Sequence, residues 1–155
     1  MGFSFGRASE RRLKGVHPDL VAVNRLALKK SSQDFTVFEG VRDIETQREY
    51  VRRGVSQTMN SKHLLQPDGY GHAVDNVPWI NGGPRWELVP CCMIAQAVRE
   101  AAEELNIRIR WGGCWQVLNG TTAPAMTLVE EYSARKRRQG RTAFIDGPHF
   151  ELYGY

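Results

Sequence analysis

The fold is decided first by the stretch Phe144-Ile-Asp-Gly-Pro-His-Phe-Glu-Leu152. Side chains alternate across a β-strand, so His149 and Glu151 share one face while Phe150 and Leu152 share the other. The apolar face predicts a strand that packs on a core and carries an imidazole on its polar side. A proline and a glycine precede the histidine, and proline disfavours a helix, so we expect the chain to enter this strand through a bend.

A second strand is predicted over Gly71–Val77, and we expect Pro78 to end it because proline cannot donate to a sheet. Asp75 would share its face with small residues, which leaves room for an ion. His72 would point to the opposite face.

Other elements follow from apolar periodicity and from Gly and Pro signals. We expect helices over 18–30, 45–53, 89–105 and 127–138, with Gly140 as a C-cap, and strands over 35–38 and 107–111. Helices and strands mix without regular alternation. The predicted class is therefore α+β, with a small, largely antiparallel sheet and flanking helices.

The length of 155 residues suits a single domain over 1–155. Hydrophobic residues make up 41% and charged residues 25%, which is ordinary for a soluble globular protein. No apolar stretch is long enough for a membrane span, so we expect no stable membrane insertion. The basic N-terminus is followed by no apolar run, so we expect no signal peptide. The three cysteines show no disulfide pattern.

The net charge is +4, and part of the excess lies in two basic clusters, within 7–14 and 135–141. Such clusters favour polyanions, including anionic cell-wall polymers. The competing interpretation is a solvated helix face. No nucleic-acid-binding motif accompanies the charge, so we expect no nucleic-acid partner.

A metal site can be assembled from His63, Asp75 and His149. Two imidazoles and one carboxylate leave the fourth tetrahedral position of zinc open to water, which is the catalytic arrangement. Asp146, on the bend before the last strand, would be a nearby carboxylate able to take a proton. His149 could instead be a solvent-facing strand residue, and His72 is the rival to His63.

The patterns Ser-x-His, Gly-x-Ala-x-Asp and Asp-x-x-His-Phe-Glu-Leu occur in this order at 61–63, 71–75 and 146–152. Together they resemble the M15 metallopeptidases, as do the segments 38–42 and 109–113. This family includes D-Ala-D-Ala carboxypeptidases and dipeptidases, and the L-alanyl-D-glutamate endopeptidases of phage endolysins.

The resemblance implies zinc ligands at His63, Asp75 and His149 and a general base at Asp146. It also implies that Arg42 holds the substrate and the developing oxyanion. We expect two further substrate-binding residues, Ser61 and Gln47, although Ser61 could equally be a turn residue.

Two departures from the family pattern are visible. The 12-residue distance between His63 and Asp75 is longer than usual, which predicts an inserted loop. Cys114 follows Gly113 where the endolysins commonly have an aspartate, and the stretch 116–141 is longer than expected.

The expected function is that of a zinc-dependent endolysin that cuts the L-alanyl-D-glutamate bond of peptidoglycan stem peptides and acts as a monomer. It would wait in the host bacterial cytoplasm until a holin releases it to the wall. The alternatives are a D-Ala-D-Ala carboxypeptidase or dipeptidase, and a non-catalytic basic wall-binding module.

Overall fold

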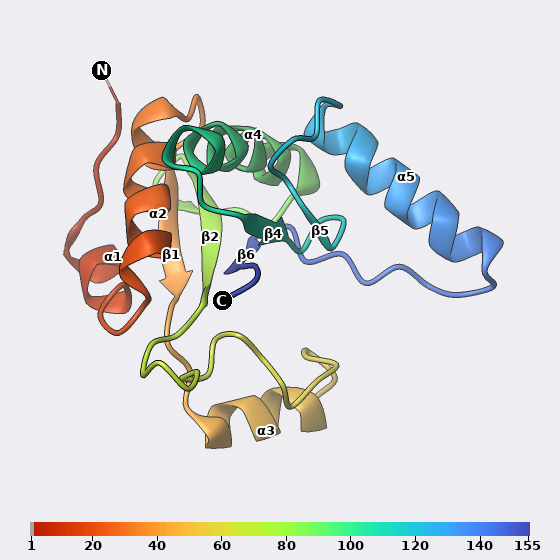
Figure 1. Cartoon of the computed structure of the whole chain (residues 1–155), viewed down its shortest axis with the longest axis horizontal. Helices are drawn as coiled ribbons and strands as arrows, with labels where there is room; N and C mark the ends of the chain where they lie inside the picture. Colours follow the sequence, from red (N-terminus) through yellow and green to blue (C-terminus); the bar gives the residue numbers. More distant parts are fainter. Residues whose placement is uncertain (1) are drawn as a thin grey trace.

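The computed structural model describes residues 2–155, in which five helices and six strands are present (Figure 1). The helices are α1 (Arg7–Arg12), α2 (Pro18–Lys30), α3 (Ile44–Arg52), α4 (Leu88–Leu105) and α5 (Ala125–Arg138). The strands are β1 (Phe35–Glu39), β2 (Ala73–Ile80), β3 (Gly83–Pro84), β4 (Ile109–Trp111), β5 (Gln116–Val117) and β6 (His149–Leu152).

The strands form one sheet in the order β1-β2-β6-β4-β5, with β3 paired to β2. Every pairing is antiparallel, which confirms the predicted class. The two strands predicted to carry the chemistry are neighbours, and Asp75 lies directly opposite His149. The sheet therefore brings together two candidate metal ligands that are 74 residues apart in the sequence.

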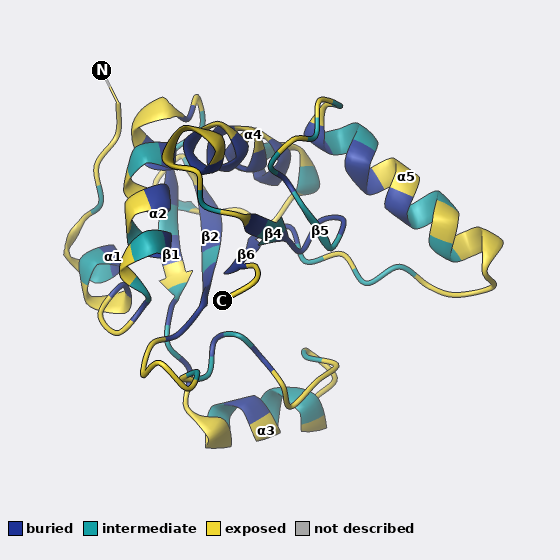
Figure 2. Ribbon diagram, viewed as in Figure 1, coloured by how far each residue is buried: buried dark blue, intermediate teal, exposed yellow. Residues whose placement is uncertain are grey.

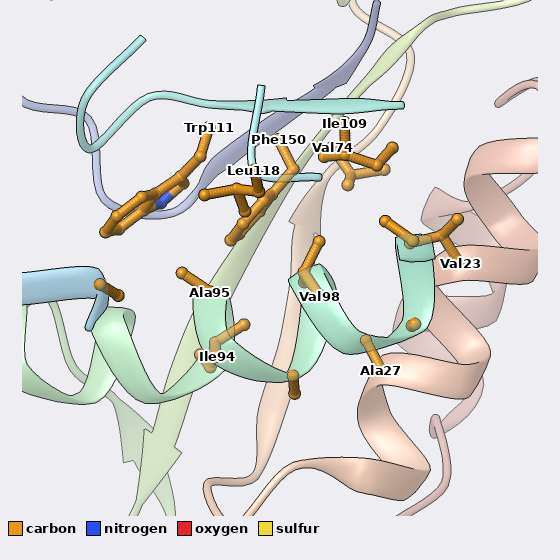
Figure 3. Packing of buried hydrophobic residues seen from close by; sticks show 14 of the residues in the cluster. Val23, Ala27, Val74, Ile94, Ala95, Val98, Ile109, Trp111, Leu118 and Phe150 are labelled. Carbon is orange, nitrogen blue, oxygen red and sulfur yellow. The ribbon is translucent and has the colours of Figure 1, made fainter. Parts of the chain in front are cut away.

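One core lies between the sheet and helices α2 and α4 (Figure 3). Trp111 and Phe150 extend from the sheet toward Ile94 and Val98 of α4, and all four are essentially buried. Burying such side chains contributes about 1.5–3 kcal/mol each. The core thus fixes the face of β6 that lies opposite His149, as the alternation predicted.

The helix ends have local causes. His17 caps α2, because its Nδ1 accepts the backbone N–H of Asp19 at 3.0 Å. Asp43 caps α3 by accepting the N–H of Thr46 at 2.7 Å. Helix α4 ends at Asn106, whose φ of 55° lies in the left-handed region.

The expectation that Pro78 ends its strand is wrong. Strand β2 continues to Ile80 because the carbonyl of Pro78 accepts the N–H of Arg85 at 2.8 Å, and the N–H of Trp79 donates to Asp34. A proline φ is compatible with a strand, and only its missing donor is lost.

Several short elements were not predicted, namely α1, β3 and β5. Helix α5 starts two residues earlier than expected, and its C-cap is Gln139, with Gly140 following at φ 69°. Figure 2 shows that the first half of α5 is packed on the body of the protein while its far half is exposed.

Two further observations bear on the sequence expectations. Across residues 2–155, none of the helices combines the length and the apolar character that crossing a membrane needs. Cys91, Cys92 and Cys114 are all buried free thiols, and none belongs to the candidate metal site.

Candidate metal centre

Three side chains converge at the junction of β2 and β6. His63 Nε2 lies 3.1 Å from Asp75 Oδ1, and His149 Nδ1 lies 3.4 Å from the same oxygen. All three ligand atoms lie within 4.8 Å of one another, and within residues 2–155 these residues form the one group of His, Cys, Asp or Glu that does so. This set, here called the metal cluster, can hold a metal ion.

His63 reaches the cluster from the loop before β2. The backbone N–H of Arg42 donates to its carbonyl at 2.9 Å, and its own N–H donates to Ser61 Oγ at 3.2 Å. The first bond attaches the loop to the segment after β1, and the second lies within the loop. The long spacing between His63 and Asp75 is therefore accommodated by a tethered loop.

In each cluster histidine, the outer nitrogen is the ring nitrogen that does not face Asp75, namely Nδ1 of His63 and Nε2 of His149. Both outer nitrogens make hydrogen bonds. His63 Nδ1 lies 2.8 Å from the carbonyl oxygen of Gly40, to which it can only donate. His149 Nε2 lies 2.7 Å from Glu151 Oε1. A neutral imidazole that donates through its outer nitrogen keeps a lone pair on the inner one. The donor set therefore fits a metal, because outer hydrogen bonds of this kind orient metal-binding histidines.

Interactions within the metal cluster favour the charged forms of His149 and Asp75. Burial opposes the charged form of His149, but hydrogen bonds to Asp75 and Glu151 outweigh it and raise its pKa to about 10. Burial likewise opposes the charged form of Asp75, yet His63 and His149 hold its pKa well below its usual range. In the metal-free protein His149 therefore carries a proton on Nδ1, the nitrogen that would bind a metal ion.

Asp146 lies beside the metal cluster on the bend before β6. Its N–H donates to the carbonyl of Gly112 at 2.9 Å, and its own carbonyl accepts the N–H of His149 at 3.1 Å. A Cβ on Gly112 would stand 2.4 Å from the Asp146 carbonyl oxygen, so only glycine permits this approach. Burial and the charge of Asp75 raise the pKa of the Asp146 carboxyl.

Arg42 is buried next to the cluster. Its Nε and Nη2 donate to the Glu39 carboxylate at 2.6 and 2.8 Å, and Nη1 donates to Gln47 Oε1 at 2.6 Å. Its Nη2 also lies 3.9 Å from Asp75 Oδ2. The guanidinium is thus fixed in place on the wall of the cavity described below.

Gln47 does not fit the predicted role of direct substrate contact. It is fully buried, and its Nε2 donates to Ser56 Oγ at 2.9 Å and to the Thr58 carbonyl at 2.5 Å. It lies behind Arg42 rather than on the cavity wall, so it positions the arginine. Ser61 is largely buried, reaches the wall and fixes the His63 loop, which matches the turn alternative.

An open cavity of about 900 Å³ surrounds the metal cluster. Its wall includes aromatic residues from distant segments, namely Phe38, Tyr50, Trp86, Trp115, Tyr132 and Phe144. Asp146 and Arg42 both face it. The site therefore combines a metal-capable cluster, a carboxyl of raised pKa and a fixed cation in one extended groove.

Glu151 and Glu39 are among the site residues that the sequence predictions missed. Glu151, which holds His149, could have been found from its position two residues on along the same strand face. Glu39, which holds Arg42, gives no comparable signal, since its pairing depends on the turn after β1.

The chain is similar to known peptidases. A family model described as phage L-alanyl-D-glutamate peptidase matches residues 1–153. The chain belongs to this family. It is 35% identical over 119 residues to the L-alanyl-D-glutamate peptidase of Escherichia phage T5, an alignment that covers 74% of this chain and 83% of that protein.

A solved structure is similar as well. The crystal structure of the Serratia marcescens L-Ala D-Glu endopeptidase ChiX superposes with a TM-score of 0.70 at 42% sequence identity. The match covers 97% of this chain and 90% of that one. Family membership confirms that the protein is a peptidase and sets aside a non-catalytic binding module.

Proposed function

We propose that this chain is a zinc-dependent peptidase that hydrolyses the L-alanyl-D-glutamate bond of peptidoglycan stem peptides. The observation that carries the proposal is the metal cluster, in which His63 Nε2, Asp75 Oδ1 and His149 Nδ1 converge in a member of this peptidase family. Two nitrogens and one oxygen are a donor set that suits zinc and leaves one position for water.

The proposed mechanism uses a water molecule as the nucleophile. Zinc, when bound, would act as a Lewis acid that makes water acidic and the scissile carbonyl electrophilic. Asp146 accepts the proton of the attacking water and then donates it to the leaving amine. A raised pKa suits a group that must hold this proton between the two steps.

Arg42 is proposed to stabilise the negative charge that develops on the carbonyl oxygen. Glu39 and Gln47 engage three of its five N–H groups, and the other two belong to a guanidinium that lines the cavity. A cation held rigidly before the reaction stabilises a developing oxyanion without reorganisation. Gln47 contributes by fixing the position of Arg42.

The test is the variant Asp146→Asn, assayed on a purified stem peptide with product identification by mass spectrometry. We expect one zinc per chain to remain, and the turnover number to fall by about 10²–10⁴, the usual contribution of a general base. Normal turnover in this variant would refute the role of Asp146. Release of D-alanine from a pentapeptide, without cleavage after L-alanine, would instead support the D,D-peptidase alternative.

We also propose that the enzyme accumulates as a monomer in the host cytoplasm and reaches the wall after a holin opens the membrane. Expression with and without a co-expressed holin tests this route. Lysis that needs both proteins supports it, and lysis by this chain alone contradicts it.

A further inference from the structure

One side of the cavity carries cations that no carboxylate fully neutralises. Each carboxylate on the wall has other neighbours: Glu39 binds Arg42, Glu151 binds His149, Asp75 lies within the metal cluster, and Asp146 lies beside that cluster. Arg110 and Lys136 also line the cavity. They come from β4 and from the basic cluster of α5, whose purpose the sequence left open.

An aromatic wall connects these two cations to the metal cluster. Trp115 lies 5.3 Å from the His149 ring and stacks on Phe144 at 6.2 Å with an interplanar angle of 15°. The indole N–H of Trp115 donates to the Phe144 carbonyl at 2.7 Å, and Tyr132 of α5 accepts the N–H of Phe144 at 3.2 Å. This wall fixes α5 relative to the site.

The backbone of Trp115 supports a functional reason for the wall. Its φ of 57° lies in the left-handed region, which an indole-bearing residue adopts only under constraint. Such strain persists where the surrounding structure determines it, and it gathers at active sites.

Both cations are positioned by this wall. The Arg110 guanidinium lies 5.4 Å from the Trp115 ring centre, and its Nε donates to the Trp115 carbonyl at 3.1 Å. Its contact with Glu151 is long, at 4.0 Å. Lys136 Nζ lies 5.8 Å from the Tyr132 ring centre. Both cations are therefore held on the cavity wall with most of their hydrogen-bonding capacity unused.

We propose that Arg110 and Lys136 form a subsite for a carboxylate next to the scissile bond, namely the free α-carboxylate of D-glutamate in the stem peptide. The inference rests on the proposed function. In the stem peptide D-glutamate is extended through its γ-carboxyl, so the α-carboxylate remains charged beside the bond that is cut. An arginine held by one nitrogen can still bind a carboxylate through its others.

The experiment compares two peptides that differ at this one group. Both contain L-alanine, a second residue and L-lysine, and the second residue is either D-glutamate or D-isoglutamine, whose α-carboxylate is an amide. The variants are Arg110→Gln and Lys136→Gln. The matched controls are Arg108→Gln and Arg137→Gln, which remove exposed cations of the same segments that do not line the cavity.

We expect the wild-type protein to favour the D-glutamate peptide in kcat/KM by about tenfold or more, since hydrogen bonds to charged groups are the stronger ones. Arg110→Gln should lower kcat/KM for that peptide by roughly tenfold, mainly through KM, and Lys136→Gln by less. Both variants should leave the D-isoglutamine peptide and the zinc content unchanged, and the controls should change neither peptide.

Equal losses on both peptides, or no loss on either, would overturn the subsite. A variant that loses zinc would show that Arg110 acts through Glu151 instead, which also overturns it. If the wild-type protein cleaves neither peptide, the proposed function itself fails, and that result is distinct from cleavage without preference.

Discussion

The metal cluster has a counterpart near the start of β2, made of His17, Asp68 and His72. His72 Nε2 lies 2.7 Å from Asp68 Oδ2, and His17 Nε2 lies 3.8 Å from the same oxygen. The two rings are 5.5 Å apart. Each cluster thus contains two histidines and one aspartate, but only one has the convergence that can hold a metal.

The two clusters also differ in the direction of their histidine protons. His17 Nδ1 accepts the N–H of Asp19, so in its neutral ring the proton is on Nε2, facing Asp68. In the metal cluster the arrangement is reversed, because the outer nitrogens of His63 and His149 face acceptors. An outer hydrogen bond of this kind keeps a lone pair available to a metal.

The largest expected effect separates the two clusters directly. His149→Ala should lose bound zinc and nearly all peptidase activity, because it removes one of three ligands. His72→Ala should keep one zinc per chain and lower the melting temperature by roughly 2–8 °C, as a buried polar side chain is lost. Zinc analysis and thermal unfolding of both variants measure this. Loss of zinc from His72→Ala alone would reverse the assignment.

The next effect is a pH dependence of the metal cluster. The pKa of His149 is raised to about 10 by its carboxylate partners, against an unfolded value near 6.5. In the metal-free protein its contribution to stability is complete below about pH 6.5 and is lost as pH rises toward 10. Zinc must displace the His149 proton, so zinc affinity should rise through this window by up to about tenfold per pH unit.

Calorimetric zinc titrations in two buffers of different ionisation enthalpy count the protons released. We expect net release at pH 7. Zinc affinity that falls as the pH rises from 7 to 9, with zinc hydrolysis controlled by a competing chelator, would contradict the protonated metal-free state.

A smaller effect tests the outer hydrogen bond. Glu151→Gln retains an acceptor for His149 Nε2 but removes the charge that makes the imidazole a better ligand. Zinc affinity should fall by about 10-fold to 100-fold, the usual cost of altering such a partner. Competition with a fluorescent chelator measures it. An unchanged affinity would show that the carboxylate charge contributes nothing.

The smallest effect is expected in the counterpart cluster. Asp68→Asn changes a half-exposed side chain that belongs to no metal-capable group. Zinc affinity and kcat/KM should both stay within twofold of the wild-type values. A marked loss of zinc would mean that the loop between His63 and Asp75 depends on Asp68 to hold the site.

The sequence could predict the elements with strong periodicity, namely α2, α4 and the strands that carry Asp75 and His149. It failed at Pro78, because a strand tolerates proline where a carbonyl and the next N–H still pair. It missed α1, β3 and β5, which are too short to show a period.

The residues of the candidate site also fall into those that local sequence could predict and those that it could not. Alternation along two strands placed Asp75 and His149 correctly, because side-chain direction is a local property. The role of Gln47 was misjudged, because its burial behind Arg42 depends on how the loop after α3 folds back. Trp115 was not predicted as a site residue, because its contact with His149 joins segments far apart in the chain.

The most direct test of the account is anomalous diffraction at the zinc edge from crystals of the zinc-loaded protein. The account predicts one strong peak within coordination distance of His63 Nε2, Asp75 Oδ1 and His149 Nδ1. A peak between His17 and His72, or none near the metal cluster in an active preparation, would contradict it.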